Sequence, residues 1–174
     1  KENATKTYPD VSVVIPYYET GEVFERCLHF LANAIAAYQG DVEVIVVDDG
    51  SIARPLVKYE NGQSWLRCIV LDSNQGRTVA RNKGLAHSSG DIVLFMDSDI
   101  LVDEQIIVNH VKIHNAALKN NKKAICVTFF EFTSLNDERI YNERILGRDL
   151  MLNDFRIECT YGPTWIGCEE DKEY

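Results

Sequence analysis

Short apolar runs that stop at polar or acidic residues alternate along this chain with segments of helical periodicity. The runs are rich in β-branched side chains, which is typical of strands buried on both faces of a sheet. They predict strands at Val11–Ile15, Val42–Val47, Leu66–Leu71, Asp91–Met96 and Lys123–Phe130. Apolar residues at helical spacing predict helices at Glu22–Tyr38, Thr78–His87 and about Asp103–Leu118. This order predicts an α/β fold with a mainly parallel central sheet flanked by helices.

The same pattern indicates how the chain is organised. Pro16 is expected to stop the first strand. After Phe132 the pattern loosens into helical fragments over Asp137–Leu152 and a loop over Glu158–Gly167. Since no repeat or clean boundary divides the chain, we expect a polar N-terminal tail over residues 1–10 and a single domain over residues 11–174.

Composition and charge narrow the classes of function. The 174 residues are 45% hydrophobic and 26% charged, which suits one globular domain with a soluble surface. The formal net charge is 18 − 27 = −9, so we expect no nucleic-acid partner, and the chain is poorly suited to an anionic membrane surface. A phosphorylated ligand would need a divalent cation or a few placed arginines to offset this charge.

The cysteines and the hydropathy of the chain bear on its location. The five cysteines form no CxxC pair, and an odd number without metal spacing favours a reducing compartment. No run approaches the roughly 18 apolar residues that span a bilayer, and no signal-peptide pattern opens the sequence. We therefore expect no transmembrane segment and a cytoplasmic location, including the cytoplasmic face of a membrane.

Acidic residues follow two of the predicted strands directly. Asp48-Asp49 comes after the second strand, and Asp97-Ser98-Asp99 comes after the fourth. Ligands of open α/β sheets bind outside the carboxyl ends of the strands, so these carboxylates are expected to share one site. Asp97 and Asp99 suit Mg²⁺ or Mn²⁺, which prefer oxygen ligands and are often completed by substrate phosphates. Strand ends that simply turn are also rich in aspartate, and this alternative stays open.

The segment between the two acidic clusters is suited to an anion. Gly76 permits a sharp entry into the following helix, whose N-terminus presents N–H groups and a positive dipole. Arg77 and Arg81 lie four residues apart on one helical face, and arginine suits bidentate contact with phosphate. The alternative is a solvated surface helix.

Four segments together resemble family 2 glycosyltransferases of the GT-A fold, in order and in spacing. They are VSVVIPYYE at Val11–Glu19, VIVVDDGS at Val44–Ser51, NQGRTVARNKG at Asn74–Gly84 and GDIVLFMDSD at Gly90–Asp99. The resemblance implies a Rossmann-like nucleotide-binding half. It also implies an enzyme that takes a sugar from a nucleotide diphosphate, often UDP, and inverts the anomeric centre.

The resemblance further implies roles for residues that follow the first two strands. Pro16, Tyr18 and Glu19 would line the nucleotide pocket. Asp49 would hold the nucleobase, with Asp48 beside it.

The resemblance also implies binding roles for the helix predicted at Thr78–His87 and for the second acidic cluster. Arg81 would approach the base or the phosphates. Asp97 would face the ribose and the sugar, and Asp99 would ligate the divalent cation, with Asp97 as a second ligand.

One further match lies near the end of the sequence. WIGCEEDKE at Trp165–Glu173 resembles the W-G-x-E-D-x-E segment of the family, in which a carboxylate is the general base. The resemblance makes Asp171 the first candidate and Glu170 the second, because an acceptor hydroxyl must give up its proton as it attacks. A solvated acidic tail is the alternative. The separation 171 − 99 = 72 residues is shorter than family members usually have, so we expect the domain to be incomplete on its C-terminal side.

The leading hypothesis is a metal-dependent inverting glycosyltransferase. Its partners would be a nucleotide-sugar donor and a hydroxyl acceptor in a glycan, a glycolipid or a small molecule, with polysaccharide as one product. Two alternatives stay open: a non-catalytic module or fragment that binds nucleotide sugars, and, less favoured, a sugar-nucleotide pyrophosphorylase. His110 and His114 are four residues apart on one helix, and they are interpreted as a packed or surface pair rather than a metal site. The oligomeric state is left open.

Overall fold

The computed structural model describes residues 8–53, 56, 63–122 and 125. The chain divides into two compact units, Lys1–Ile107 and Val108–Tyr174, and each is considered by itself. The elements, in chain order, are β1 (Val11–Tyr17), α1 (Glu22–Ala37), β2 (Val42–Asp48), β3 (Leu66–Val70), α2 (Arg77–Ala86), β4 (Ile92–Phe95) and α3 (Ile106–Lys119). All except most of α3 belong to the first unit.

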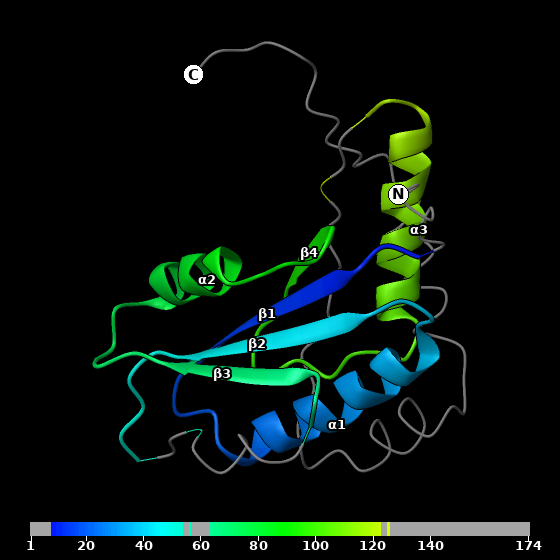
Figure 1. The fold of residues 1–174 in the computed structure, drawn as a ribbon. Coiled ribbons are helices and arrows are strands. Elements are labelled where there is room, and N and C mark those ends of the chain that lie inside the picture. The colour runs from blue at the N-terminus through cyan, green and yellow to red at the C-terminus, as the bar shows by residue number, and fades with distance from the viewer. Residues whose placement is uncertain (1–7, 54–55, 57–62, 123–124, 126–174) are drawn as a thin grey trace, which may run out of the picture. The chain divides into compact units, whose positions relative to one another are not determined.

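The described strands form one sheet with the order β3-β2-β1-β4. Every neighbouring pair is parallel, which confirms the parallel sheet predicted from the alternation of strands and helices. In the central pair, Val11 lies opposite Val42 and Tyr17 lies opposite Asp48. Because the strands run in one direction, the ends of β1, β2 and β4 meet at one edge of the sheet (Figure 1), which we call the carboxyl edge.

The helices α1 and α2 cover opposite faces of the sheet (Figure 1). On one face, Tyr17 of β1 packs edge-on against Phe24 of α1, with ring centroids 5.0 Å apart. On the other face, α2 approaches the sheet closely at Gly84. A Cβ added there would lie 2.3 Å from Val14 Cγ1 and 3.3 Å from Val47 Cγ2. The missing side chain of Gly84 therefore sets the distance between α2 and the sheet.

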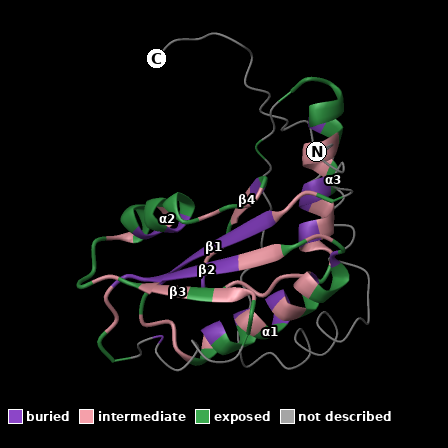
Figure 2. Ribbon diagram, viewed as in Figure 1, coloured by how far each residue is buried: buried purple, intermediate pink, exposed green. Residues whose placement is uncertain are grey.

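The core of the first unit lies in β1 and β2. Every residue of β1 is buried, and so are the last five residues of β2 (Figure 2). A central parallel strand is covered by helices on both faces, so it needs apolar side chains in an unbroken run. This explains why VSVVIPY and VEVIVV show no alternation of polar and apolar positions.

Pro16 does not stop β1, so the sequence prediction was wrong at this position. The strand continues past it, and Pro16 pairs in register with Val47. The carbonyl of Val14 accepts a hydrogen bond from the Met96 N–H, so alternate residues of β1 that include Pro16 face β4. Pairing with β4 ends at Val14 and Phe95. Pro16 therefore lies beyond the last paired residue, where its missing N–H removes no hydrogen bond between strands.

The start of α3 also differs from the prediction. The helix begins at Ile106 rather than near Asp103. The Asp103 carboxylate accepts a hydrogen bond from the Gln105 N–H at 2.7 Å, and the Asp103 carbonyl accepts one from the Ile106 N–H at 3.1 Å. Such side-chain bonds to nearby backbone compete with helix formation, so Asp103 forms a turn before the helix.

Several predicted features lie outside the described residues. They are the helical fragments over Asp137–Leu152, the loop over Glu158–Gly167 and, apart from Ile125, the strand over Lys123–Phe130. The expectation of a single domain over residues 11–174 stays a prediction.

Candidate functional site

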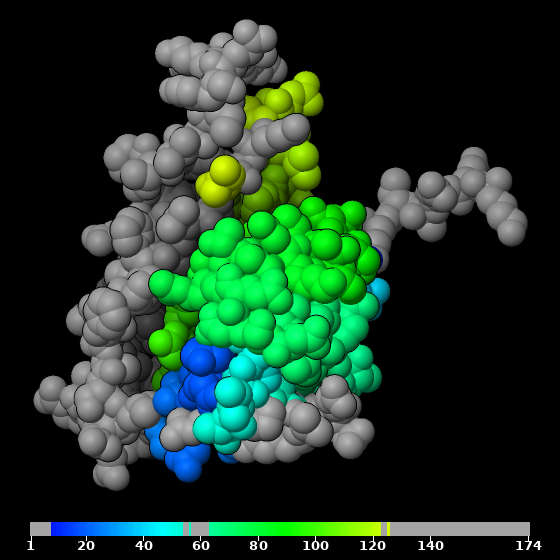
Figure 3. Space-filling model, turned by 90° about the vertical axis from the view of Figure 1, so that its left-hand side faces the viewer, coloured from blue at the N-terminus to red at the C-terminus, as the bar shows by residue number. Residues whose placement is uncertain are grey.

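The carboxyl edge brings together the segments that follow β1 and β2, the start of α2 and the segment that follows β4. Figure 3 looks onto this side of the first unit and shows residues near 20 in blue, those near 50 in cyan and the region of α2 in green, next to one another. Most of the residues to which the sequence assigns binding roles lie in these segments. Their side chains, however, differ in their contacts and in their exposure to solvent.

Asp48 is completely buried and holds the segment that follows β2. One carboxylate oxygen accepts a hydrogen bond from the Ser51 N–H at 2.9 Å, and the other accepts one from the Leu56 N–H at 3.2 Å. A buried carboxylate costs free energy unless such bonds compensate it. Asp48 is therefore a structural acceptor in this conformation.

Asp49 holds the start of α2. Its carboxylate is 3% exposed and accepts hydrogen bonds from the Gln75 N–H at 2.7 Å and the Gly76 N–H at 2.8 Å. Successive residues of a strand point to opposite faces, so Asp48 and Asp49 fix different loops. Gly76 has a φ of +94°, a conformation that glycine adopts without strain, and α2 begins at the next residue.

Glu19 ties the segment after β1 to the segment after β2. Its N–H donates to Ser51 Oγ at 3.0 Å, and its Oε1 accepts hydrogen bonds from the Ile52 N–H at 2.6 Å and the Ala53 N–H at 2.9 Å. Its φ of +53° is uncommon for a residue with a side chain. These bonds explain how the conformation is held. Glu19 thus lies at the edge that the resemblance implies, with its carboxylate turned to the neighbouring loop.

The other two residues expected after β1 differ in exposure. Pro16 is buried inside the strand, whereas the Tyr18 side chain is 49% exposed at the edge. Of these two side chains, Tyr18 is therefore the accessible one at the carboxyl edge.

Arg81 joins α2 to the segment after β4. Its Nη2 lies 2.5 Å from Asp97 Oδ1, and both side chains are 35% exposed. Arg77, which the sequence places on the same helical face, is exposed at the first residue of α2. The two arginines therefore have different surroundings, and the described structure pairs Arg81 with the acidic cluster.

The Asp97-Ser98-Asp99 segment forms a turn in which the Ser98 side chain points inward and the Asp99 side chain points outward. Ser98 is buried, and its Oγ lies 2.6 Å from Thr20 Oγ1 in a hydrogen bond across the edge. Asp99 is exposed. The sequence analysis did not single out Thr20 or Ser98. For Ser98 the available signal was its position between the two aspartates.

The buried thiol of Cys27 on α1 lies next to this turn. Its Sγ lies 4.0 Å from the Asp97 carbonyl oxygen. Burial, and then the negative charge of Asp99, raises the pKa of the thiol to about 12. Cys27 is therefore a protonated core residue at neutral pH.

The acidic cluster fits a hard divalent cation that takes part of its coordination from a ligand. In the described part of the chain, no three His, Cys, Asp or Glu side chains gather as a complete metal site. The turn offers two carboxylates, of which Asp99 is exposed and Asp97 shares one oxygen with Arg81. Mg²⁺ and Mn²⁺ are commonly bound in this way, through one or two carboxylates with substrate phosphates and water.

Two expected groups of residues lie elsewhere. Glu170 and Asp171, the candidates for the general base, are outside the described residues. His110 and His114 lie on α3 in the second unit. Burial, and then the charge of His114, lowers the pKa of His110 to about 4, which suits a packing residue.

Searches for similar proteins agree with the resemblance. The family model for Glycosyl transferase family 2 matches residues 12–169. The chain is 37% identical over 108 residues to Glycosyltransferase AglE of Haloferax volcanii, covering 58% of this chain and 34% of that protein. It is 29% identical to an N-acetylglucosaminyltransferase of Rhizobium sp., covering 95% of this chain and 33% of that protein. The chain thus spans about a third of the length of these two curated relatives.

Solved structures share the fold. The S. aureus TarS structure superposes with a TM-score of 0.57 at 23% identity, covering 74% of this chain and 23% of TarS. This likeness confirms the fold class of a GT-A type with a parallel central sheet flanked by helices. Within the described residues, no helix is both long enough and apolar enough to cross a bilayer.

Proposed function

Because the chain belongs to glycosyl transferase family 2, we propose that it is a metal-dependent inverting glycosyltransferase with its donor site at the carboxyl edge. The donor is a nucleotide diphosphate sugar, and the acceptor is a hydroxyl group of a glycan, a glycolipid or a small molecule. The observation that carries this proposal is the arrangement at the carboxyl edge. There Asp49 and Arg81 attach one helix to the ends of β2 and β4, beside the exposed carboxylate of Asp99.

The proposed donor carries UDP. A TarS structure of the same fold was solved in complex with UDP, and several relatives are named N-acetylglucosaminyltransferases. Tyr18 is exposed at the edge, where a nucleobase could lie against its ring. The carboxylates of Asp48, Asp49 and Glu19 hold the surrounding loops by accepting hydrogen bonds from backbone N–H groups of those loops. A direct contact between Asp49 and the base is part of the proposal.

A divalent cation, Mn²⁺ or Mg²⁺, is proposed to bind at Asp99 with Asp97 as its second protein ligand. When bound, such an ion neutralises the charge of the two phosphates and of the departing diphosphate. The chain itself carries a net charge of −9, so its own acidic side chains would otherwise repel the donor. Arg77 at the start of α2 is exposed and is available to the phosphates.

Sugar transfer is proposed to be a single displacement. Asp171, or Glu170 as second choice, takes the proton of the acceptor hydroxyl as its oxygen attacks the anomeric carbon. The bond from that carbon to the diphosphate oxygen breaks on the opposite face, and the diphosphate leaves with the bonding electrons. Attack on the face opposite the leaving group inverts the configuration. The two carboxylates are proposed from the sequence match alone.

A non-catalytic module that binds nucleotide sugars is the second candidate. It requires only the arrangement at the carboxyl edge, where Asp49 and Arg81 hold α2 beside Asp99, and no general base. In this case the donor site would bind without turnover.

One screen tests the proposed function. The melting temperature of the chain is measured with UDP-, GDP- and dTDP-sugars, each with and without Mn²⁺, and donor hydrolysis or transfer is followed in parallel. We expect stabilisation by a UDP-sugar that depends on Mn²⁺, because a ligand that binds the folded state raises its stability. Stabilisation without turnover would support the binding module. A chain that responds to none of the donors would contradict both candidates.

A further inference from the structure

Helix α2 connects two strand ends that are not neighbours in the sheet. Asp49 at the end of β2 accepts hydrogen bonds from Gln75 and Gly76, just before α2 begins. Arg81 in the second turn of α2 pairs with Asp97 after β4. The strand β1 lies between β2 and β4. The two contacts therefore fix the helix to both sides of the central strand, at the carboxyl edge.

The helix has little room to move between these contacts. Gly84 lies against Val14 and Val47, where even one added carbon would clash at 2.3 Å. Ala80, one residue before Arg81, is buried against Ile45 and Val47. The Cα of Arg81 is thus held by core packing, and its guanidinium reaches Asp97 from a fixed base.

The salt bridge itself contributes little to stability. Both side chains are 35% exposed, and the Nε of Arg81 is buried without a hydrogen-bond partner among the described residues. Partly solvated ion pairs contribute little, and an unsatisfied buried donor is costly. Local costs of this kind are expected where a residue serves a function. A role in geometry explains the pair better than a role in folding.

We propose that Arg81 is a positioning residue: it holds the Asp97 carboxylate in the orientation that the metal and donor require. This inference rests on the proposed function and differs from the role that the resemblance implies for Arg81, since Arg81 then acts through Asp97 rather than by approaching the base or the phosphates. The pairing occupies Oδ1 of Asp97 and leaves Oδ2 for a ligand. It also offsets part of the negative charge between Asp97 and Asp99.

The test separates metal binding from nucleotide binding. UDP binding to the whole chain is measured by calorimetry over a range of Mn²⁺ concentrations for wild type, Arg81→Gln, Asp97→Asn and the double variant. For Arg81→Gln we expect the apparent Kd for Mn²⁺ to rise about tenfold, which is about 1.4 kcal/mol. The Kd for UDP at saturating Mn²⁺ is expected to stay within about twofold, a change below about 0.5 kcal/mol. The double variant should bind no more weakly than Asp97→Asn, because residues that act as one unit are not additive.

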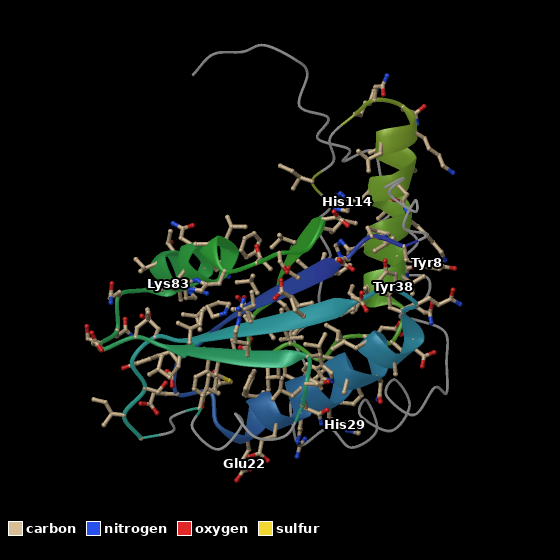
Figure 4. All side chains as sticks on the ribbon, in the orientation of Figure 1. Tyr8, Glu22, His29, Tyr38, Lys83 and His114 are labelled. Carbon is tan, nitrogen blue, oxygen red and sulfur yellow. The ribbon has the colours of Figure 1, made fainter. Side chains whose placement is uncertain are left out.

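Two further variants complete the design. Lys83→Gln removes a positive charge from an exposed position on the same helix (Figure 4) and should leave both affinities unchanged. Arg81→Lys keeps the charge with a different shape, and its apparent Kd for Mn²⁺ should fall between wild type and Arg81→Gln. It serves as the main variant if Arg81→Gln does not fold, as judged by thermal unfolding.

Each other outcome overturns the inference. A weaker Kd for UDP at saturating Mn²⁺ would show that Arg81 contacts the nucleotide. Additive effects of Arg81→Gln and Asp97→Asn would show that the two residues act separately. If wild type bound UDP with Mn²⁺ and both Arg81 variants matched it, the positioning role alone would fail. If wild type bound no UDP, the proposed function would fail as well.

Discussion

The Gly76 N–H donates a hydrogen bond of 2.8 Å to Asp49 Oδ2, and this bond joins the end of β2 to the residue before α2. The neighbouring Gln75 N–H binds the other oxygen of the same carboxylate. Asp49 therefore satisfies two backbone N–H groups at the entrance to α2. The same residue thus has a structural role and lies at the proposed donor site.

Asp49→Asn is expected to lower the free energy of unfolding by about 1–3 kcal/mol, because the amide NH₂ must face a backbone N–H that loses its acceptor. Denaturant unfolding measures the change, with the slope m expected to stay constant. Asp72→Asn, at an exposed position after β3, is the matched control and should change stability by less than about 0.5 kcal/mol. Equal stability of Asp49→Asn and wild type would contradict the structural role of the carboxylate.

Gly84→Ala is expected to destabilise the chain by about 1–3 kcal/mol through overpacking. The overpacking arises because the added carbon would meet Val14 Cγ1 at 2.3 Å. The gain in helix propensity from replacing glycine, about 1 kcal/mol, is too small to offset it. Removing that methyl group should restore room, so Gly84→Ala with Val14→Ala should cost less than the sum of the single changes. Asn82→Ala on the exposed face of α2 is the control. Strict additivity would show that Gly84 and Val14 are not in close contact.

Cys27 is expected to react with thiol reagents far more slowly than Cys68. Cys27 is fully buried and its pKa is raised to about 12, chiefly by burial and then by the charge of Asp99, whereas Cys68 is partly exposed. Alkylation at pH 8, followed by peptide mass mapping, compares the two rates. Unfolding the chain should make the rates similar. Fast labelling of Cys27 in the folded chain would contradict its burial.

Stability is expected to fall as the pH is lowered from about 6.5 to 4. The pKa of His110 is about 4 in the folded chain, against an ordinary value of 6.5, because burial and then His114 disfavour the charged form. Between these values the unfolded chain binds a proton that the folded chain excludes, so stability rises with pH in this window. The loss at low pH is on the order of 3 kcal/mol.

Unfolding at several pH values measures this effect. His110→Leu should remove part of the slope between pH 4 and 6.5, because leucine has no proton to bind. The matched variant His29→Gln, at an exposed position on α1 (Figure 4), should keep the slope. An unchanged slope in His110→Leu would show that His110 is not the group responsible.

Local patterns were sufficient to predict the described strands, their parallel arrangement and two of the helices. The strands β1, β2, β3 and β4 and the helices α1 and α2 follow from apolar runs and helical spacing. Pro16 was misjudged because its effect depends on which neighbour its missing N–H would face. That neighbour, β4, lies far along the chain and ends before reaching it.

The contacts of the site could not be predicted in the same way. The sequence shows that Asp48 and Asp49 follow a strand, but their acceptor roles depend on which N–H groups the folded chain brings near. Gln75 lies 26 residues from Asp49, and Thr20 lies 78 residues from Ser98. Side chains paired over such distances leave no local pattern, so only the folded arrangement reveals them.

The metal dependence of UDP binding tests the central claim most directly. Calorimetry compares wild type, Asp99→Ala and the control Glu104→Ala, which removes an exposed carboxylate five residues further on. For wild type and Glu104→Ala we expect Mn²⁺ to strengthen UDP binding at least tenfold, or about 1.4 kcal/mol. Asp99→Ala should bind UDP equally weakly with and without the ion. If Asp99→Ala responded to Mn²⁺ as wild type does, the carboxylates at this edge of the sheet would not form the metal and donor site.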